Sequence, residues 1–353
     1  MNRFIQEGAS IDALTAMNAF SRWPTWMWAN TDILNLMDDL KDWNEHSEES
    51  VGFHGLDVYS LYESLDEVQT LLKEIDPYLA AEVKEFYSCF GPYRHDEKAY
   101  ARSLTHKNEG CKREVSKALQ KILEKKLSDG GKVMNVVQNA RIIQNAEHYY
   151  HVMMSMEDDS WNVRDRHMTE TLDMLLKHYG NQSKAIVWAH NTHIGDFRAT
   201  DMANYGQVNI GGLARMKHGE ENVALVGFTT YQGEVIASHA WDGPIEVMTV
   251  PEGKSHSLEK VLHDCVEQMG HHNFYLDFDG LDPLTEFYDF IGHRAIGVVY
   301  HPHQERRGNY VPTIPGKRYD ALVFFDKTQA LTPLNVKFQK EKMPETYPYG
   351  SRL

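Results

Sequence analysis

The chain has few cysteines. Only Cys89, Cys111 and Cys265 occur in 353 residues. A sparse, odd-numbered set without close spacing argues against a disulfide framework and against a thiolate zinc site. We therefore expect a protein of a reducing compartment, the cytoplasm.

Long apolar runs are also missing. The first residues, MNRFIQEGASIDALTAM, contain no basic stretch followed by an apolar one, so the sequence predicts no secretory signal peptide. No apolar run approaches the roughly 18 residues that a membrane-spanning helix needs. We therefore expect no membrane partner.

Positive charge is scarce relative to negative charge. Lysine and arginine number 36 against 51 aspartates and glutamates, for a net charge of −15. Such a chain is repelled by phosphate backbones and anionic membrane surfaces, which excludes nucleic acid as an expected partner. A neutral or cationic small molecule is compatible with this charge.

Several catalytic signatures are absent from the sequence. It has no G-x-S-x-G elbow, no phosphate-binding glycine loop, no dinucleotide fingerprint and no H-E-x-x-H motif. These absences exclude the common serine hydrolases, nucleotide enzymes and zincin proteases as first choices.

The composition is that of a globular protein, with 42% hydrophobic and 25% charged residues, and the length suits a large α/β domain with an added helical part. Helical spacing of apolar residues predicts helices over 30–44, 60–75, 78–87, 112–127, 133–156, 163–179 and 258–269, with a helical turn at 213–218. Short apolar runs predict strands over 51–56, 185–189, 223–228, 235–238, 273–278, 295–300 and 321–325, the third and fourth pairing across Gln232-Gly233.

Strands separated by helices predict an α/β fold with a largely parallel sheet and flanking helices. We expect residues 1–78 to form the first part of the α/β core. Residues 79–180 would form a helical lid or insertion, and 181–353 the remainder of the core.

The segment WAHNTHIGD is the strongest candidate site, because it follows the predicted strand 185–189 directly. Ligands bind outside the carboxyl ends of strands in α/β sheets. His190 and His193 can move protons near neutral pH, and Asp196 or a neighbouring carbonyl could fix an imidazole tautomer. The alternative is that one histidine packs in the core and the other is solvated, since the chain has 19 histidines.

Three further residues have two interpretations each. Asp57 follows the predicted strand 51–56, so it could orient a histidine or a substrate hydroxyl, or cap the next helix. Arg164 could hold an oxyanion or a carboxylate, or lie in an exposed first helical turn. Trp26, in the cluster RWPTWMW, belongs either to the core or to the wall of an apolar pocket.

A series of segments resembles the erythromycin esterase family. The segments are RWPTWMW at 22–28, VGFHGLDVYSLYES at 51–64, QNARIIQNAEHYY at 138–150, WNVRDRHM at 161–168, WAHNTHIGD at 188–196, NIGGLAR at 209–215, VGFTTYQGEVIAS at 226–238, RAIGVVYHP at 294–302 and NYVPTIPGKRYDALVFFD at 309–326. Each segment alone is modest evidence, but their order over nearly the whole chain is specific to this family.

The resemblance implies an α/β core with a helical portion over a deep cleft. It also implies a hydrolase that opens a macrolide lactone or a similar bulky ester, as in resistance to antibiotics, with a histidine that activates water and with no metal or cofactor. By motif match, His190 and His193 are the family's paired cleft histidines. Asp57, Arg164 and Asp165 match further family motifs.

The sequence departs from the family's pattern at its start. The family begins with a G-E-x-x-H-G segment, whose histidine is the presumed base, and then has an E-A/G-D-W stretch. Neither occurs here, and residues 2–5 match the family's pattern just after that second stretch. We therefore expect an N-terminally truncated chain that is weak or inactive as an esterase and exposes apolar sheet surface.

Two other functions remain open from the sequence. One is a metal-dependent hydrolase with His190, His193 and Asp196 as ligands. The other is a non-catalytic protein that retains macrolide binding. The sequence does not indicate the oligomeric state.

Overall fold

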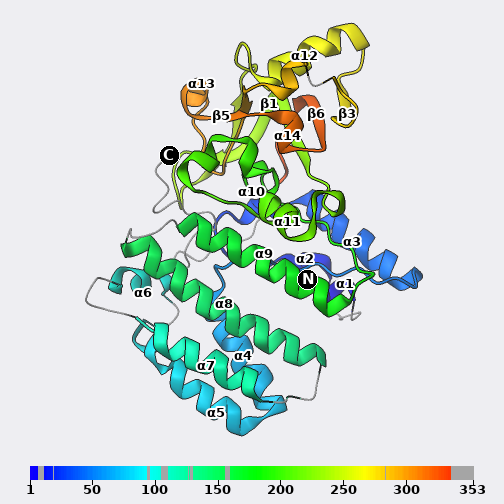
Figure 1. Ribbon diagram of the computed structural model, residues 1–353. Coiled ribbons are helices and arrows are strands. Elements are labelled where there is room, and N and C mark those ends of the chain that lie inside the picture. Colours follow the sequence, from blue (N-terminus) through cyan, green and yellow to red (C-terminus); the bar gives the residue numbers. More distant parts are fainter. Residues whose placement is uncertain are drawn as a thin grey trace. The chain divides into compact units, whose positions relative to one another are not determined.

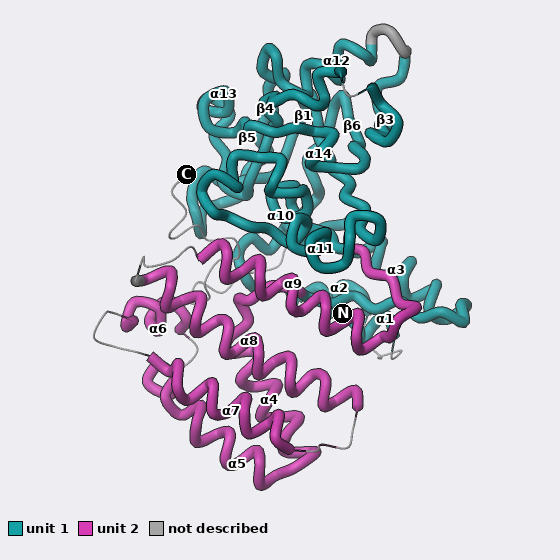
Figure 2. Tube along the Cα trace, viewed as in Figure 1, with its two compact units in different colours: residues 1–55, 187–340 teal, residues 56–186, 341–353 magenta. Residues whose placement is uncertain are grey.

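The computed structural model describes residues 1–6, 12–18, 20–93, 96–104, 110–125, 127, 130–155, 160–282 and 284–334. Internal contacts divide the chain into two compact units (Figure 2). The first combines residues 1–55 with 187–340, and the second contains residues 56–186. The helical unit thus begins before the predicted boundary at 79 and includes the predicted helix 60–75.

The first unit contains the sheet. Its helices are α1 (Asn2–Ile5), α2 (Ala13–Met17), α3 (Thr31–His46), α10 (Asn191–Ile194), α11 (Ile210–His218), α12 (Leu258–Met269), α13 (Glu305–Gly308) and α14 (Pro315–Arg318) (Figure 1). Its strands are β1 (Val226–Ser238), β2 (Ile245–Val250), β3 (Asn273–Asp277), β4 (Ile291–Arg294), β5 (Tyr310–Thr313) and β6 (Ala321–Thr328).

Four strands form a mixed sheet in the order β2-β1-β6-β3. The central pair, β1 and β6, is parallel, with Val226 opposite Ala321. The outer pairs, β1 with β2 and β3 with β6, are antiparallel. Strands β4 and β5 form a separate antiparallel pair. The predicted α/β class is confirmed.

Helix α12 packs on this sheet through a stripe of buried side chains. Leu258, Leu262 and Val266 recur at four-residue spacing and share a core cluster with Leu322 and Phe324 of β6. Ser257 caps the helix, since its side chain accepts a hydrogen bond from the amide of Lys260. The predicted helix 258–269 is confirmed.

The predicted hairpin across Gln232-Gly233 is wrong, because the chain continues through it as one strand, β1. Gly233 has a φ of 135°, and a Cβ there would lie 2.2 Å from the carbonyl oxygen of Thr328. The glycine is therefore needed for close approach of β1 to β6 rather than for a turn.

Three predicted strands do not form ladders. Within the described residues, 51–56 and 185–189 carry no strand assignment, and 295–300 makes only a single bridge, from Val299 to Ser238 of β1. Their apolar composition favours extended backbone, but a ladder also requires a neighbouring strand with free amides and carbonyls. One consequence is exposure: the side chains of Ile186 and Trp188 are 98% and 61% exposed.

The described part of the second unit is helical. It comprises α4 (Leu61–Ile75), α5 (Pro77–Phe86), α6 (Glu97–Ser103), α7 (Lys112–Glu124), α8 (Gly130–Ser155) and α9 (Ser160–Tyr179). Their apolar faces meet in one cluster that includes Val68, Leu72, Val83, Ala118 and Ile143. The helices predicted for this region are confirmed. None of the helices in the described ranges has the length and hydropathy to cross a bilayer.

The cysteine spacing argued against a disulfide framework, but one pair of cysteines is bonded. Cys89 and Cys111 form a disulfide, with their Cα atoms 5.9 Å apart, although they lie 22 positions apart in sequence. Pairing depends on distance in space, which sequence spacing does not report. The bond joins the 3-10 segment Tyr87–Tyr93 to the start of α7. Cys265 is free.

A buried ion pair connects the separate strand pair with the main sheet. Arg294, at the end of β4, donates to the Glu305 carboxylate at 2.9 Å and to the carbonyl oxygens of Thr230, Tyr231 and Pro251 at 2.7–2.8 Å. Glu305 is fully buried and also accepts from the hydroxyl groups of Tyr300 and Tyr310. Every charge in this cluster is matched, as a buried pair requires.

Glu305→Gln is expected to destabilise the protein by about 3–5 kcal/mol, because it leaves the buried Arg294 guanidinium without a counter-charge. The measurement is the free energy of unfolding from a denaturant titration. The control is Asp264→Asn, which breaks the exposed pair with Lys260 and should cost less than about 1 kcal/mol. Equal losses in the two variants would contradict the structural role of the buried pair.

Candidate active site

His190 forms the N-cap of the short helix α10. Its Nδ1 accepts from the Thr192 amide at 3.2 Å and lies 2.7 Å from the Thr192 hydroxyl. Its Nε2 lies 3.1 Å from the carbonyl oxygen of Ile296. Because a carbonyl can only accept, the proton of the neutral ring is on Nε2. The tautomer is thus fixed by a neighbouring carbonyl, one of the two possibilities that the sequence offered.

Burial lowers the pKa of His190 to about 4, and electrostatic interactions with His193 and Arg318 act in the same direction. The ring nevertheless retains contact with solvent, since His190 is exposed. Protein atoms therefore surround much of the imidazole, while part of the residue remains open to solvent. With this lowered pKa, the ring is neutral at physiological pH.

Asn191 fixes the first residue of the turn to the sheet. Its carboxamide donates to the carbonyl oxygen of Phe228 at 2.6 Å and accepts from the amide of the same residue at 3.2 Å. Both are backbone groups of β1, so the side chain takes the place of a neighbouring strand. The Asn191 carbonyl accepts from Arg318 at 3.1 Å.

His193 is buried, with 6% of its surface exposed, and α11 packs closely against its turn. Asn209 caps α11 and donates to the carbonyl oxygen of Thr192 at 2.7 Å. At Gly211 a Cβ would lie 2.1 Å from the carbonyl oxygen of Ile194. Only glycine permits this separation of α10 and α11.

Asp196 closes the turn through arginines. Its carboxylate accepts from Arg198 at 2.9 and 2.6 Å and lies 3.5 Å from Arg215. It is 2% exposed, and its contacts with the arginines end the turn; its role in orienting an imidazole stays a prediction. Among the residues that the structure describes, no three His, Cys, Asp or Glu side chains are grouped to hold a metal ion.

Asp57 and Arg164 meet in the second unit. Arg164 donates from Nε to Oδ1 at 2.9 Å and from Nη2 to Oδ2 at 2.6 Å. Its guanidinium lies 5.1 Å from the Tyr59 ring centre and is nearly buried, so the exposed helical turn considered from the sequence is wrong. Asp165, next along α9, is fully buried.

Trp26 belongs to the packed interior of the first unit. Its indole nitrogen donates to the carbonyl oxygen of Ile236 at 3.3 Å, and its ring meets Trp23 edge-on at 5.2 Å. With 4% of its surface exposed, it offers little area to a ligand here. The binding roles of Trp26, Asp57, Arg164 and Asp165 stay predictions.

Two residues beside the turn were not found by sequence reasoning. His293 on β4 lies with Nε2 3.4 Å from the Asn191 carboxamide, and Glu259 on α12 contacts the other nitrogen of that ring at 2.8 Å. Both are buried. Neither residue belongs to a recognisable sequence motif, and both lie more than sixty residues from the turn in sequence. Only the folded structure therefore shows that they are neighbours of the turn.

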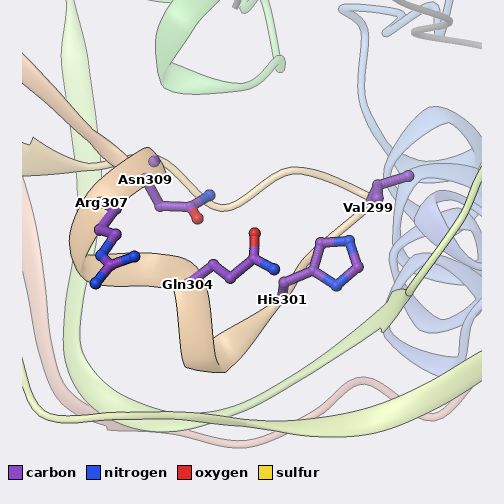
Figure 3. A pocket seen from close by; sticks show the side chains of 6 residues that line it. Val299, His301, Gln304, Arg307 and Asn309 are labelled. Carbon is purple, nitrogen blue, oxygen red and sulfur yellow. The ribbon is translucent and has the colours of Figure 1, made fainter.

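A hollow of about 480 Å³ opens beside α13 (Figure 3). It is lined by Val299, His301, Gln304, Arg307, Gly308 and Asn309. The side chains of His301, Gln304, Arg307 and Asn309 can donate hydrogen bonds. Val299 lies three positions after Ile296 in the sequence, and the Ile296 carbonyl is the partner of His190.

Comparison with known proteins places the chain in a family. The model of the erythromycin esterase family matches residues 1–328. The chain belongs to the erythromycin esterase family. This membership supports a hydrolase and a link to macrolide resistance, and the predicted resemblance is confirmed.

Solved structures share the fold of this family member. A succinoglycan biosynthesis protein matches with a TM-score of 0.69 and 18% identity, covering 91% of this chain and 78% of the other. A Bacillus cereus protein matches with a TM-score of 0.67 and 18% identity, covering 92% and 80%. A mutant of the erythromycin esterase EreC in its open conformation matches with a TM-score of 0.59 and 13% identity, covering 94% and 82%.

Gly211→Ala is expected to destabilise this family member by about 1–3 kcal/mol, because the new methyl group would overlap the Ile194 carbonyl and separate α11 from α10. Thermal unfolding measures the effect. Gly308→Ala is the matched control, since a Cβ there meets no atom within 4 Å. An unchanged melting temperature in the Gly211 variant would contradict the close approach.

The His190 ring is expected to stay neutral until the pH falls towards 4, well below its ordinary pKa of 6.5. The folded state then binds fewer protons than the unfolded state between these values, so this residue's contribution to stability rises with pH across that window and is lost as pH falls. Histidine NMR titration measures it directly. His46, whose pKa is raised by its bond to the Asp42 carbonyl, is the internal control; a His190 midpoint near 6.5 would contradict the assignment.

Proposed function

We propose that the chain hydrolyses a carboxylic ester at the turn formed by His190, Asn191 and His193. Family membership supports ester hydrolysis. The observation that supports this location is the fixed His190 tautomer, because it places an N–H donor on Nε2, at present bonded to the Ile296 carbonyl, in a residue that is exposed to solvent.

In this proposal His190 polarises the scissile group. Water adds to the ester carbonyl carbon and gives up a proton to a base, negative charge develops on the carbonyl oxygen, and a hydrogen-bond donor stabilises it. The tetrahedral intermediate then collapses, the C–O bond breaks, and the leaving alkoxide takes up the proton that the water gave up. Exchanging the Ile296 carbonyl for the substrate oxygen would let the Nε2–H of His190 act as that donor.

His190 is a poor candidate for the water-activating base. Its Nδ1 is occupied by Thr192, and a pKa of about 4 leaves little driving force for proton abstraction near pH 7. We therefore propose that His190 does not activate the water and that turnover by this chain is slow. His193, buried in the same turn, binds or polarises the ester together with His190.

The proposed substrate is a bulky neutral or cationic ester, such as a macrolide lactone. The net charge of −15 favours a protonated amino sugar over an anionic ligand. The hollow beside α13 provides polar groups for the part of the substrate remote from the ester (Figure 3).

Purified protein is expected to hydrolyse p-nitrophenyl butyrate slowly and to convert a 14-membered macrolide to a product heavier by one water. His190→Asn and His193→Asn should each lower the rate by about 10²-fold or more, because each removes a group that stabilises the transition state. Absorbance measures the first reaction and mass spectrometry the second.

The control is His303→Asn, an exposed histidine outside the turn, which should leave both rates unchanged. Equal rates in all variants would place the reaction elsewhere. Macrolide binding by calorimetry without a mass change in the ligand would instead identify a non-catalytic binding protein.

A further inference from the structure

A buried chain of hydrogen bonds leads to the turn from a distant helix. It begins at Glu259, the second residue after the N-cap of α12, and passes through His293 of β4 to the carboxamide of Asn191. Glu259 and His293 are 0% and 1% exposed, and all three residues belong to the first unit.

The Glu259 carboxylate is held by one of its two oxygens. Oε1 accepts from the Thr229 hydroxyl at 2.8 Å, from His293 Nδ1 at 2.8 Å and from the Arg294 amide at 2.9 Å. Oε2 is buried and has no partner among the described residues. Burying a carboxylate with one oxygen unsatisfied is costly for stability, so its presence calls for a role that an apolar residue could not fill.

That role is to fix the proton of His293. The carboxylate can only accept, so His293 carries its proton on Nδ1, and Nε2 is left as an acceptor. Burial also lowers the pKa of His293, which keeps the ring neutral. In the opposite tautomer, Nε2–H would face the N–H groups of Asn191, and two donors would oppose each other.

The acceptor at Nε2 in turn orients the Asn191 carboxamide. One N–H donates to the Phe228 carbonyl at 2.6 Å and the other faces His293 Nε2 at 3.4 Å, while Oδ1 accepts from the Phe228 amide at 3.2 Å. A rotation by 180° would reverse all three contacts. The carboxamide therefore has a single satisfied orientation.

We propose that Glu259 and His293 are positioning residues for the candidate site: together with the two Phe228 backbone groups, they hold the Asn191 carboxamide in the orientation that fixes the turn carrying His190 and His193 to β1. Neither residue contacts the substrate. The effect on catalysis rests on the function proposed above, whereas the effect on Asn191 does not.

The test compares His293→Phe with His263→Phe in the full chain. His263 lies on α12 and pairs with the Asp326 carboxylate at 2.6 Å, so its substitution removes a similar histidine–carboxylate pair away from the turn. Glu259→Gln is the second variant: it keeps the volume and the acceptor but removes the charge that selects the His293 tautomer.

The readout independent of activity is NMR. In the unaltered protein, His293 should show a protonated Nδ1 and an unprotonated Nε2, and the Asn191 side-chain amide should exchange slowly with solvent. His293→Phe should speed Asn191 amide exchange by at least tenfold, and Glu259→Gln should give a mixture of His293 tautomers. His263→Phe should change neither.

The kinetic readout is ester hydrolysis. His293→Phe should lower kcat by roughly tenfold or more with KM little changed, because misplacement of the turn affects the transition state more than binding. A folded His293→Phe variant with unchanged Asn191 exchange, or a folded Glu259→Gln variant with an unchanged His293 tautomer, would overturn the proposal. Altered exchange in protein without any esterase activity would support positioning and reject the proposed function.

Discussion

The first unit depends on the buried pair of Arg294 and Glu305. The Arg294 guanidinium donates hydrogen bonds to three carbonyl oxygens from two strand regions. It also neutralises the Glu305 carboxylate, which is fully buried. Both ends of the loop 295–304 are thereby fixed. Within that loop the Ile296 carbonyl meets His190, so the tautomer of a candidate catalytic histidine depends on an ion pair that lies outside the site.

The candidate site is consequently held from several directions by groups that are individually modest. A carbonyl orients His190, β1 holds Asn191, and arginines close the turn at Asp196. Hydrogen bonds of about 1 kcal/mol each achieve this together because they all act on the one turn at 190–196. Such a turn keeps its backbone in place, so in the proposed reaction only the Ile296 carbonyl need leave His190 for the substrate.

Sequence patterns predicted the helices well, because apolar spacing reports directly on which face of a helix is buried. They also located the turn at 190–196. They were less informative on strands: apolar runs such as 185–189 and 295–300 are extended or irregular here, since pairing depends on neighbours that a local pattern does not contain. The Cys89–Cys111 disulfide and the roles of Glu259 and His293 were inaccessible for the same reason, because each is a relation between residues distant in sequence.

The glycines around the turn have an evolutionary consequence. At Gly195, Gly211 and Gly212 a single added carbon would approach neighbouring atoms to between 2.1 and 2.6 Å. No side chain, however small, is accommodated at these positions without a shift of a neighbour. Related sequences are therefore expected to keep glycine at these three positions even where the histidines have been replaced. The glycines would then identify this turn in sequences that have lost the proposed catalytic residues.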